Sequence, residues 1–400
     1  MSTLKVNKLR DTAGSADAIV LDPNGGAVLA GVTTVTSVKV GAAVTISESG
    51  IEASGIGITC ANINGTQIGG RRNIVINGAM NVAQRGTSST SDGFGSLDRF
   101  MANLGGNDEN ATQSQADISS GTTPYTTGFR KSFKFTNGNQ TGGAGSGDRV
   151  TILHRIEAQD IANSGWNYTD PNSFITLSFW VKSSVAQNFY GFLRTSDGTA
   201  QLYPFETGSL SQDAWTKITK TIPGNSNLQF DNNVNIGLEI EWDMFRGTDT
   251  TGSISLNAWG AYNSSVRVPD MTSDWYETDN ATFELTGFQL EVGSQATPFE
   301  HRSFGEELQQ CFRYYRVQSK SRASGKMGGS VNYAVMVSFP LSPPMRNTPT
   351  VAMYGSANYN GNVSNIGTVN ISNDHVGFIA DISDNNYYYY NNGWTADAEL

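Results

Sequence analysis

Hydrophobic and polar residues alternate along the centre of this chain of 400 residues. In residues 175–181 and 236–242 every second side chain is hydrophobic, and Glu239, Glu241 and Asp243 fall on the opposite face of the second segment. A period of two with one polar face is typical of an antiparallel sheet that is buried on one side and solvated on the other. The recurrence of this pattern predicts one antiparallel β-sandwich in the centre of the chain.

The alternation changes phase near the end of this central region. Phe283 and Leu285 share one parity, whereas Phe288 and Leu290 share the other, and Gly287 lies between the two pairs. An extra residue in one strand of an antiparallel pair produces such a shift, and glycine is common there. The sequence therefore predicts a β-bulge at Gly287.

A helical period follows the last strand of the central region. Ser303 and Glu306 have the spacing of a capping box, which satisfies two backbone donors at a helix start. The positions that follow form one apolar stripe, as on an amphipathic helix: Leu308, Cys311, Phe312 and Tyr315. The pattern predicts a connecting helix over residues 303–318, in which Cys311 is a small core group rather than a reactive thiol.

Beyond the helix, a polar connection is expected over residues 318–329, and strand patterns then resume. Val335, Val337 and Phe339 alternate with other residues, as in a half-buried strand. Residues 319–400 are therefore predicted to form a small C-terminal β-domain that resembles a sandwich.

The first seventy residues contain short runs of valine, isoleucine and threonine that glycines interrupt. No aromatic residue precedes Phe94, and aromatic side chains supply much of the buried area of an ordinary core. Strands with small side chains cannot build a core alone, whereas copies of them wound around a common axis can. We therefore expect a trimeric β-stalk over residues 1–70. The alternative is a flexible linker, which the frequent β-branched residues disfavour.

The charge and the hydrophobic runs of the chain bear on whether it binds nucleic acid or enters a membrane. The net charge is −10 and the isoelectric point is near 4.8, so a basic stripe for nucleic acid is absent from the sequence. No apolar run approaches the ~20 residues that span a bilayer, and the first residues lack the pattern of a secretory signal. We expect neither nucleic-acid binding nor membrane insertion.

Several runs in the chain are specific enough to compare with known families. They are FQLEVGSQATPFEHRSFGEEL (288–308), NIVINGAMNVAQRG (73–86), LSFWVKS (177–183), WTKITKTIP (215–223) and STLKVNKL (2–9). In this order they resemble segments of bacteriophage tail fibre and virion appendage proteins. The first run is the most specific, and the last resembles the start of fibres that attach to a tail.

This resemblance implies a virion protein of the tail fibre, built as a homotrimer. It implies that the N-terminal region, including Leu4, Val6 and Leu9, attaches to a tail adaptor or nozzle protein. It also implies that residues 71–302 form a jelly-roll domain similar to a carbohydrate-binding module. The C-terminal domain is where such fibres diverge to meet a host receptor during adsorption.

A host-surface glycan is the expected ligand, because the flat C–H faces of sugars stack on aromatic rings. One predicted platform lies in polar, loop-like sequence of the central domain: Trp166, Tyr168, Trp259 and Tyr262. The alternative for these four is that they cap the core of the sandwich. A second predicted surface lies near the C-terminal end of the sequence, where an exposed aromatic patch would mark a binding site: Tyr388, Tyr390 and Trp394.

Catalysis is not expected, although a polysaccharide-degrading appendage enzyme is the alternative function. Glu239 and Glu241 lie on one strand face about 7 Å apart, a spacing that glycoside hydrolysis permits without requiring. A solvated strand face explains both residues, because neither has an apolar setting that would raise the pKa of a general acid.

No cofactor is expected from the sequence. The three histidines, His154, His301 and His375, have no metal-ligand spacing. The exception is a structural calcium in an Asp/Asn-rich loop such as residues 231–233, because calcium requires only oxygen ligands.

Overall fold

The computed structural model describes the backbone of residues 72–326, 333–354, 363–382 and 387–400, together with short strands before residue 72. Side-chain surroundings are described for residues 72–319, 336–354, 367–379, 381 and 393–400. The chain divides into two compact units, Met1–Ala61 and Asn62–Leu400. Within the described part, no helix is long and apolar enough to cross a membrane.

The first unit contains two small antiparallel sheets. The first sheet joins β1 (Lys8–Arg10), β2 (Asp17–Leu21) and β3 (Ala27–Leu29), and the second joins β4 (Ser37–Val40), β5 (Val44–Ser47) and β6 (Gly50–Ala53). The trimeric β-stalk expected over residues 1–70 stays a prediction. Leu4, Val6 and the side chain of Leu9 lie outside the described residues, so their predicted role in attachment also stays a prediction.

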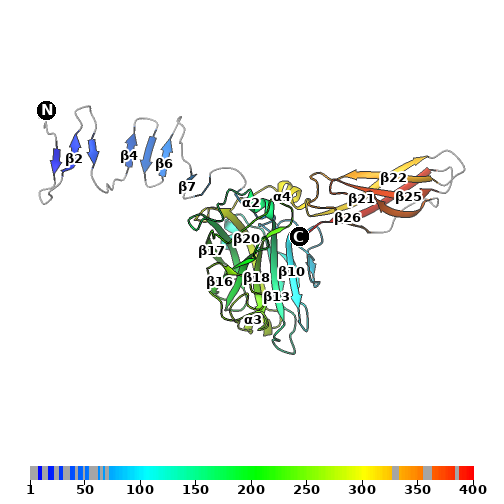
Figure 1. The fold of residues 1–400 in the computed structure, drawn as a ribbon, viewed down its shortest axis with the longest axis horizontal. Helices are drawn as coiled ribbons and strands as arrows, with labels where there is room; N and C mark the ends of the chain where they lie inside the picture. Colours follow the sequence, from blue (N-terminus) through cyan, green and yellow to red (C-terminus); the bar gives the residue numbers. More distant parts are fainter. Residues whose placement is uncertain are drawn as a thin grey trace. The chain divides into compact units, whose positions relative to one another are not determined.

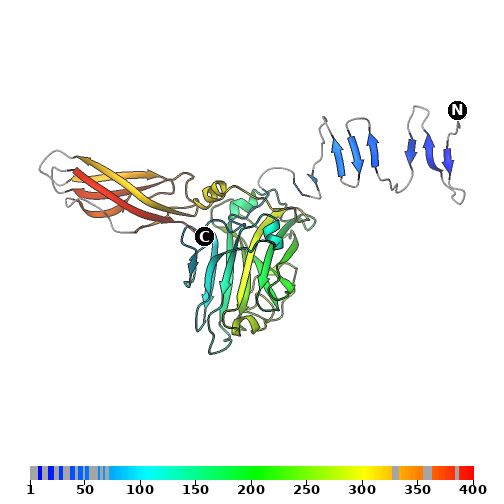
Figure 2. The same ribbon diagram turned by 180° about the vertical axis from the view of Figure 1, so that it is seen from behind.

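The second unit begins with the short pair β7 (Asn62–Ile63) and β8 (Thr66–Gln67), followed by a sandwich of two six-stranded sheets that lie face to face in both views (Figure 1 and Figure 2). The first sheet has the order β10 (Phe100–Gly105), β13 (Arg149–Glu157), β18 (Ile236–Arg246), β15 (Asn188–Thr195), β16 (Gln201–Ser209) and β19 (Gly260–Ala261). The second sheet has the order β17 (Thr216–Pro223), β14 (Phe174–Ser183), β20 (Thr282–Val292), β12 (Lys131–Thr136), β11 (Thr112–Asp117) and β9 (Ser88–Ser89). All pairings within these sheets are antiparallel. The predicted jelly-roll sandwich is confirmed.

Aromatic rings fill the space between the two sheets. The rings of Trp242 and Phe288 meet edge to face with centroids 4.5 Å apart, and Phe179 lies 5.7 Å from Trp242. Edge-to-face pairs at such distances stabilise a core beyond the area that they bury. These residues come from β18, β20 and β14, so the inward faces predicted from the alternation form the core.

The predicted bulge is present at Gly287. Ser178 pairs with Gln289, and Trp180 pairs with Thr286, so two residues of β20 oppose one residue of β14. Gly287 has a φ of +63°, a conformation that glycine adopts without steric cost. The extra residue turns Phe288 to the same face as Phe283, which explains the change of parity.

The polar face of β18 differs from the prediction. Glu239, Glu241 and Asp243 are 3%, 1% and 0% exposed rather than solvated. The reason is that residues from the long β18–β20 connection, including Val268 and Tyr262, pack over this side of the sheet. Strand β18 is therefore buried on both faces, although hydrophobic and polar residues alternate along its sequence.

Three short helices accompany the sandwich: α1 (Thr123–Thr126), α2 (Ala158–Ala162) and α3 (Asp274–Glu277). Figure 1 shows α3 at one end of the two sheets and α2 at the other end. The loops beside α3 form the site described below.

The connecting helix α4 (Phe304–Cys311) begins with the predicted capping box. The Ser303 hydroxyl accepts from the Glu306 N–H, and the Glu306 carboxylate accepts from the Ser303 N–H. Cys311 is fully buried, as predicted. The helix is shorter than the predicted range of 303–318, and Tyr315 already belongs to a strand.

The C-terminal domain consists of two three-stranded sheets, in agreement with the predicted small sandwich. One has the order β21 (Tyr315–Lys326), β26 (Tyr387–Asp397) and β23 (Thr350–Tyr354), and the other has the order β22 (Tyr333–Pro340), β25 (His375–Ile382) and β24 (Val363–Val369). The expected polar connection over residues 318–329 is wrong, because most of it pairs with β26. Phe378, Trp394 and Met345 are among the buried residues of this small core.

Candidate functional site

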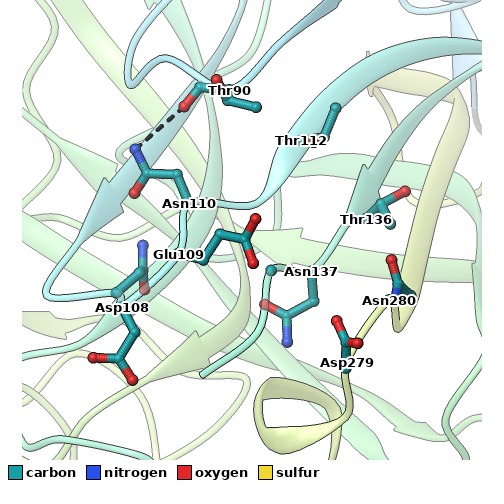
Figure 3. A pocket seen from close by; sticks show the side chains of 11 residues that line it. Thr90, Asp108, Glu109, Asn110, Thr112, Thr136, Asn137, Asp279 and Asn280 are labelled. Carbon is teal, nitrogen blue, oxygen red and sulfur yellow. Dashed lines mark hydrogen bonds between the residues drawn. The ribbon is translucent and has the colours of Figure 1, made fainter. Parts of the chain in front are cut away.

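An open polar cleft lies at the α3 end of the sandwich (Figure 3). Its volume is about 590 Å³, and it is lined entirely by threonine, asparagine, aspartate, glutamate and glycine. Most of it is formed by three chain segments: residues 107–112 between β10 and the start of β11, residues 136–138 at the end of β12, and residues 279–280 before β20; Thr90, after β9, completes the lining. We call this site the polar cleft.

Hydrogen bonds hold the first two of these segments together. The Glu109 carboxylate accepts from the Asn139 N–H at 2.8 Å, and the Glu109 main-chain oxygen accepts from the Gln140 side chain at 2.7 Å. A Cβ atom on Gly138 would lie 2.5 Å from that oxygen. Glycine at this position therefore permits the close approach that places Glu109 beside the end of β12.

Asn137 attaches the end of β12 to α3. Its side chain is 2% exposed, and its Nδ2 atom donates to the main-chain oxygens of Tyr276 at 2.5 Å and Thr278 at 3.2 Å. Asn280 follows this turn with a φ of +58°, a left-handed conformation that asparagine tolerates well. The third wall of the cleft is thereby fixed to the second.

Tyr276 lies behind the lining of the cleft and contacts Asn107. Its ring stacks on Phe245 with centroids 4.2 Å apart, and its hydroxyl lies 3.1 Å from Asn107 Oδ1 and 3.0 Å from Asp148 Oδ2. Burial and the neighbouring Asp148 raise the pKa of this phenol, so the hydroxyl stays protonated and can donate. The Asn107 Nδ2 donor has no hydrogen-bond partner among the described residues.

The side chains that face the opening are mostly acceptors. Figure 3 shows Asp279 and Asn280 on one side of the cleft and Asp108 and Asn110 on the other, with Glu109 between the two sides. Asn110 is oriented by a hydrogen bond of 3.2 Å from its Nδ2 atom to the Thr90 main-chain oxygen. The cleft therefore offers carboxylate and amide groups from rigid backbone, which suits a ligand rich in hydroxyl groups.

A second, smaller cavity lies on the outer face of the second sheet. Its volume is about 180 Å³, and the aromatic residues that line it are Phe129, Trp180, Phe299 and His301. We call it the aromatic recess. Its lining contains no carboxylate and includes Lys217, so its character is opposite to that of the polar cleft.

The four aromatic residues predicted as one platform do not form one cluster: Trp166 and Tyr168 pack together, whereas Trp259 and Tyr262 each pack elsewhere. Trp166 is 3% exposed and packs with Tyr168 and Phe230 at the edge of the core. Trp259 packs 5.3 Å from Tyr203 and donates from its indole N–H to the Pro223 main-chain oxygen. Trp166 thus has the core-capping position that was the alternative.

Tyr262, the fourth of these residues, lies over the outer face of the first sheet. Its ring is 5.1 Å from the Arg194 guanidinium and packs with the cluster around Phe192. Of the predicted C-terminal surface, Trp394 is 3% exposed and belongs to the small core. The side chains of Tyr388 and Tyr390 lie outside the described residues, and their binding role stays a prediction.

The carboxylate pair considered for catalysis is engaged in ion pairs. Glu239 contacts Arg155 at 2.8 Å and Arg194 at 3.0 Å, whereas Glu241 pairs with Arg246. Burial raises the pKa of Glu241 to about 7, although the Arg246 charge opposes this rise. The expected solvated setting is therefore wrong for both residues, and neither lines the polar cleft or the aromatic recess.

The metal-ligating residue types do not converge in the described part of the chain. No group of three or more histidine, cysteine, aspartate or glutamate residues there has a geometry that would hold a metal ion. The calcium considered near residues 231–233 stays a prediction from the sequence.

Comparisons with known proteins show similarity at the level of structure. No protein-family model matches the chain, and no curated protein matches it. The enzymatically active domain of tailspike protein 4 from bacteriophage CBA120 is 10% identical with a TM-score of 0.29, covering 55% of this chain and 21% of that chain. This chain therefore spans about a fifth of that tailspike chain.

Two carbohydrate-binding modules show similarly low sequence identities and TM-scores. The N-terminal cellulose-binding domain of β-1,4-glucanase C from Cellulomonas fimi is 12% identical with a TM-score of 0.25, covering 54% of this chain and 99% of that chain. A family 11 module from Clostridium thermocellum, in complex with a mixed-linked tetrasaccharide, is 12% identical with a TM-score of 0.23, covering 54% and 98%. At these TM-scores the similarities carry no argument about what this chain does.

Sequence reasoning found neither the polar cleft nor the aromatic recess. The cleft joins residues that are about 170 positions apart, such as Asp108 and Asp279, and none of them belongs to a recognisable motif. The recess carries more sequence signals, because the predicted bulge at Gly287 forms part of its lining and the runs 177–183, 215–223 and 288–308 contribute most of its other residues.

Proposed function

We propose that this chain is a structural protein of a virion tail fibre and that it binds a host cell-surface glycan without cleaving it. The observation that carries the glycan part is the polar cleft, whose lining consists only of hydrogen-bonding side chains and glycine. A ligand that is bound mainly by its hydroxyl groups fits such a surface.

The donors and acceptors of the cleft favour a neutral or amino sugar. Carboxylates accept hydrogen bonds only, and each offers two oxygens to sugar hydroxyls. Asp108, Glu109 and Asp279 together make the cleft acidic, which disfavours an anionic glycan. Hydrogen bonds to charged acceptors are stronger than neutral ones, so few contacts suffice for orientation.

The virion part of the proposal rests on the sequence. The resemblance of residues 288–308 and 73–86 to tail fibre proteins supports a place in the virion, with attachment through residues 2–9 to a tail adaptor or nozzle protein. A homotrimer would present three clefts at once, and multivalent attachment raises avidity without a tight single site. Host adsorption would then follow from many weak glycan contacts.

The absence of cleavage is part of the proposal. It is supported by the burial of Glu239 and Glu241, which are 3% and 1% exposed, pair with arginines and line neither the polar cleft nor the aromatic recess. The alternative is a polysaccharide-degrading appendage enzyme.

Titration calorimetry of the purified intact protein with host envelope polysaccharide tests the proposal. Because Asp279 and Asn110 are exposed, Asp279→Ala and Asn110→Ala should leave the fold intact. Loss of a ligand hydrogen bond should weaken binding by about tenfold or more for the charged Asp279 and by about two- to tenfold for the neutral Asn110. Asp117→Ala is the matched control, because this exposed carboxylate lies at the other end of β11 from the cleft.

Two results would contradict the proposal. Unchanged affinity in both cleft variants would show that the cleft is not the glycan site. Release of shorter saccharides during incubation with the intact protein would show that the chain is an enzyme.

A further inference from the structure

The aromatic recess is formed on the outer face of the second sheet by three strands, β14, β17 and β20, and by two segments outside the strands. Trp180 of β14 and the bulge at Gly287 of β20 contribute from the sheet, while residues 127–129 and 297–301 contribute from the segments that cross it. The cavity of about 180 Å³ is much smaller than the polar cleft and has room for one sugar ring rather than a chain.

Gly287 allows the aromatic rings to close over the backbone. A Cβ atom at this position would lie 2.6 Å from Phe129 Cζ and 3.0 Å from Trp180 Cδ1. The bulge therefore has a second consequence besides the change of parity, because it brings two rings from different elements to one side of the sheet.

The wall of the recess that residues 127–129 and 297–301 form is closely packed. The rings of Phe129, Phe299 and His301 are mutual neighbours with centroid distances of 4.8 to 5.0 Å. The His301 Nε2 atom donates to the Thr127 main-chain oxygen at 3.0 Å. The recess is thus formed without a ligand, which lowers the entropic cost of binding.

Backbone hydrogen bonds fix the crossing segment to β20. The Thr297 N–H donates to Glu291 Oε1 and the Glu300 N–H donates to Gln289 Oε1, each at 2.8 Å. The side chains of Glu291 and Gln289 are buried by these contacts. Phe299, between the two anchors, is held at the wall of the recess.

The charge of the recess comes from Lys217. In the pairing of β14 with β17, Lys217 lies directly opposite Trp180, and its side chain is exposed. Lys182, two positions along β14, is by contrast paired with Glu284 at 2.8 Å. Among the described residues no carboxylate lies within ion-pair distance of the Lys217 ammonium.

We propose that the aromatic recess binds a single sugar ring that carries a carboxylate, as in a uronic acid unit of an acidic polysaccharide. The C–H face of the ring packs against Trp180 and Phe299, and the carboxylate pairs with Lys217. This inference adds a second site of opposite charge to the proposed function, and it holds or fails independently of the polar cleft.

The test compares two probes that differ in one group, methyl β-glucuronide and methyl β-glucoside, by ligand-observed NMR titration of the intact protein. We expect the glucuronide to bind at least about tenfold more tightly, because its carboxylate gains a charge-assisted contact. Added salt should reduce this difference, since the lysine is exposed and its charge is screened.

Variants assign the binding to the recess. Lys217→Gln should weaken glucuronide binding to the level of the glucoside, and Phe299→Ala should weaken both probes. Lys134→Gln, which removes a lysine from β12 of the same sheet, is the charge control and should change neither. Asp279→Ala of the polar cleft should also leave glucuronide binding unchanged, which separates the two sites.

Three outcomes overturn the inference: no saturable binding of the glucuronide, equal binding of both probes, or glucuronide binding that survives Lys217→Gln. Equal binding that Phe299→Ala removes would show an apolar pocket without selectivity for acids. Loss of envelope polysaccharide binding in cleft variants with retained glucuronide binding would leave the recess assignment intact.

Discussion

Arg99 and Glu399 form a buried ion pair although 300 positions separate them in the sequence. Their side chains are 1% and 5% exposed, and the Arg99 guanidinium also lies 3.5 Å from the centroid of the Tyr314 ring. Arg85 also pairs with Glu399, because its Nη1 atom lies 3.3 Å from Glu399 Oε1. The last described residues are therefore held against the sandwich by buried charges rather than by a sheet.

Glu399→Ala should destabilise the protein strongly, because it leaves the Arg99 charge buried without its partner. Loss of one member of a buried ion pair costs about 3–5 kcal/mol, measured by urea unfolding of the intact chain. Asp117→Ala is the control, since this carboxylate is 84% exposed in its pair with Lys131 and exposed pairs contribute little. Equal effects of the two substitutions would contradict the prediction.

Gly287→Ala should destabilise the sandwich by about 1–3 kcal/mol, because alanine at positive φ is strained and its methyl group would meet Phe129. Thermal unfolding measures the loss. Gly305→Ala in α4 is the matched control, since a Cβ there meets nothing within 4 Å and alanine favours a helix by about 0.5–1 kcal/mol. A variant at Gly287 that is as stable as the parent protein would refute the strained bulge.

His154 should make the protein less stable in mild acid. It packs between Phe100 and Phe288, and burial, with the Arg99 charge beside it, lowers its pKa well below 6.5. The unfolded chain then binds a proton that the folded chain does not, so stability is retained above pH 6.5 and falls as the pH decreases below that value, by up to about 1.4 kcal/mol per pH unit.

Unfolding of the parent protein and of His154→Gln at pH 7.5 and pH 5.5 checks this dependence. The variant cannot titrate at this position, so its stability should fall less than that of the parent protein over the interval. Parallel losses in the two proteins would show that His154 is not the source.

Ser303→Ala should cost about 1 kcal/mol, because the hydroxyl that accepts from the Glu306 N–H is lost from the start of α4. Ser273 also precedes a helix, α3, but its side chain makes no capping hydrogen bond. Ser273→Ala should therefore have a smaller effect in the same thermal unfolding measurement. A reversed order would mean that the capping box does not stabilise α4.

The predicted trimeric stalk determines the mass expected for the intact protein in solution. Light scattering of the intact protein should report three times the chain mass of 42.9 kDa, because residues 1–70 lack the large side chains of an independent core. A mass of one chain would refute the trimeric assembly.

The sequence was most informative where one strand or one helix turn determines the outcome. The parity of Phe283 and Leu285 against that of Phe288 and Leu290 located the bulge, because side-chain direction in a strand depends only on position. Ser303 and Glu306 located the start of α4 for a similar reason, since a capping box is a local hydrogen-bond pattern.

Predictions from the sequence were wrong where packing against a second element determines the structure. Tyr315 has the spacing of a helical stripe, yet its backbone pairs with Asp397 in β26, and this pairing ends the helical pattern. Glu241 and Asp243 have the spacing of a solvated face, yet a loop without periodicity covers them.

The sequence by itself determined the all-β class, the inward faces of the strands and the local signals for the bulge and the helix, because these depend on neighbours a few positions apart. Only the tertiary structure decided which polar residues are buried and which loops meet. The polar cleft joins Asp108 to Asp279 and the aromatic recess joins Phe129 to Phe299, and such pairs come together through sheet packing, which no local pattern encodes.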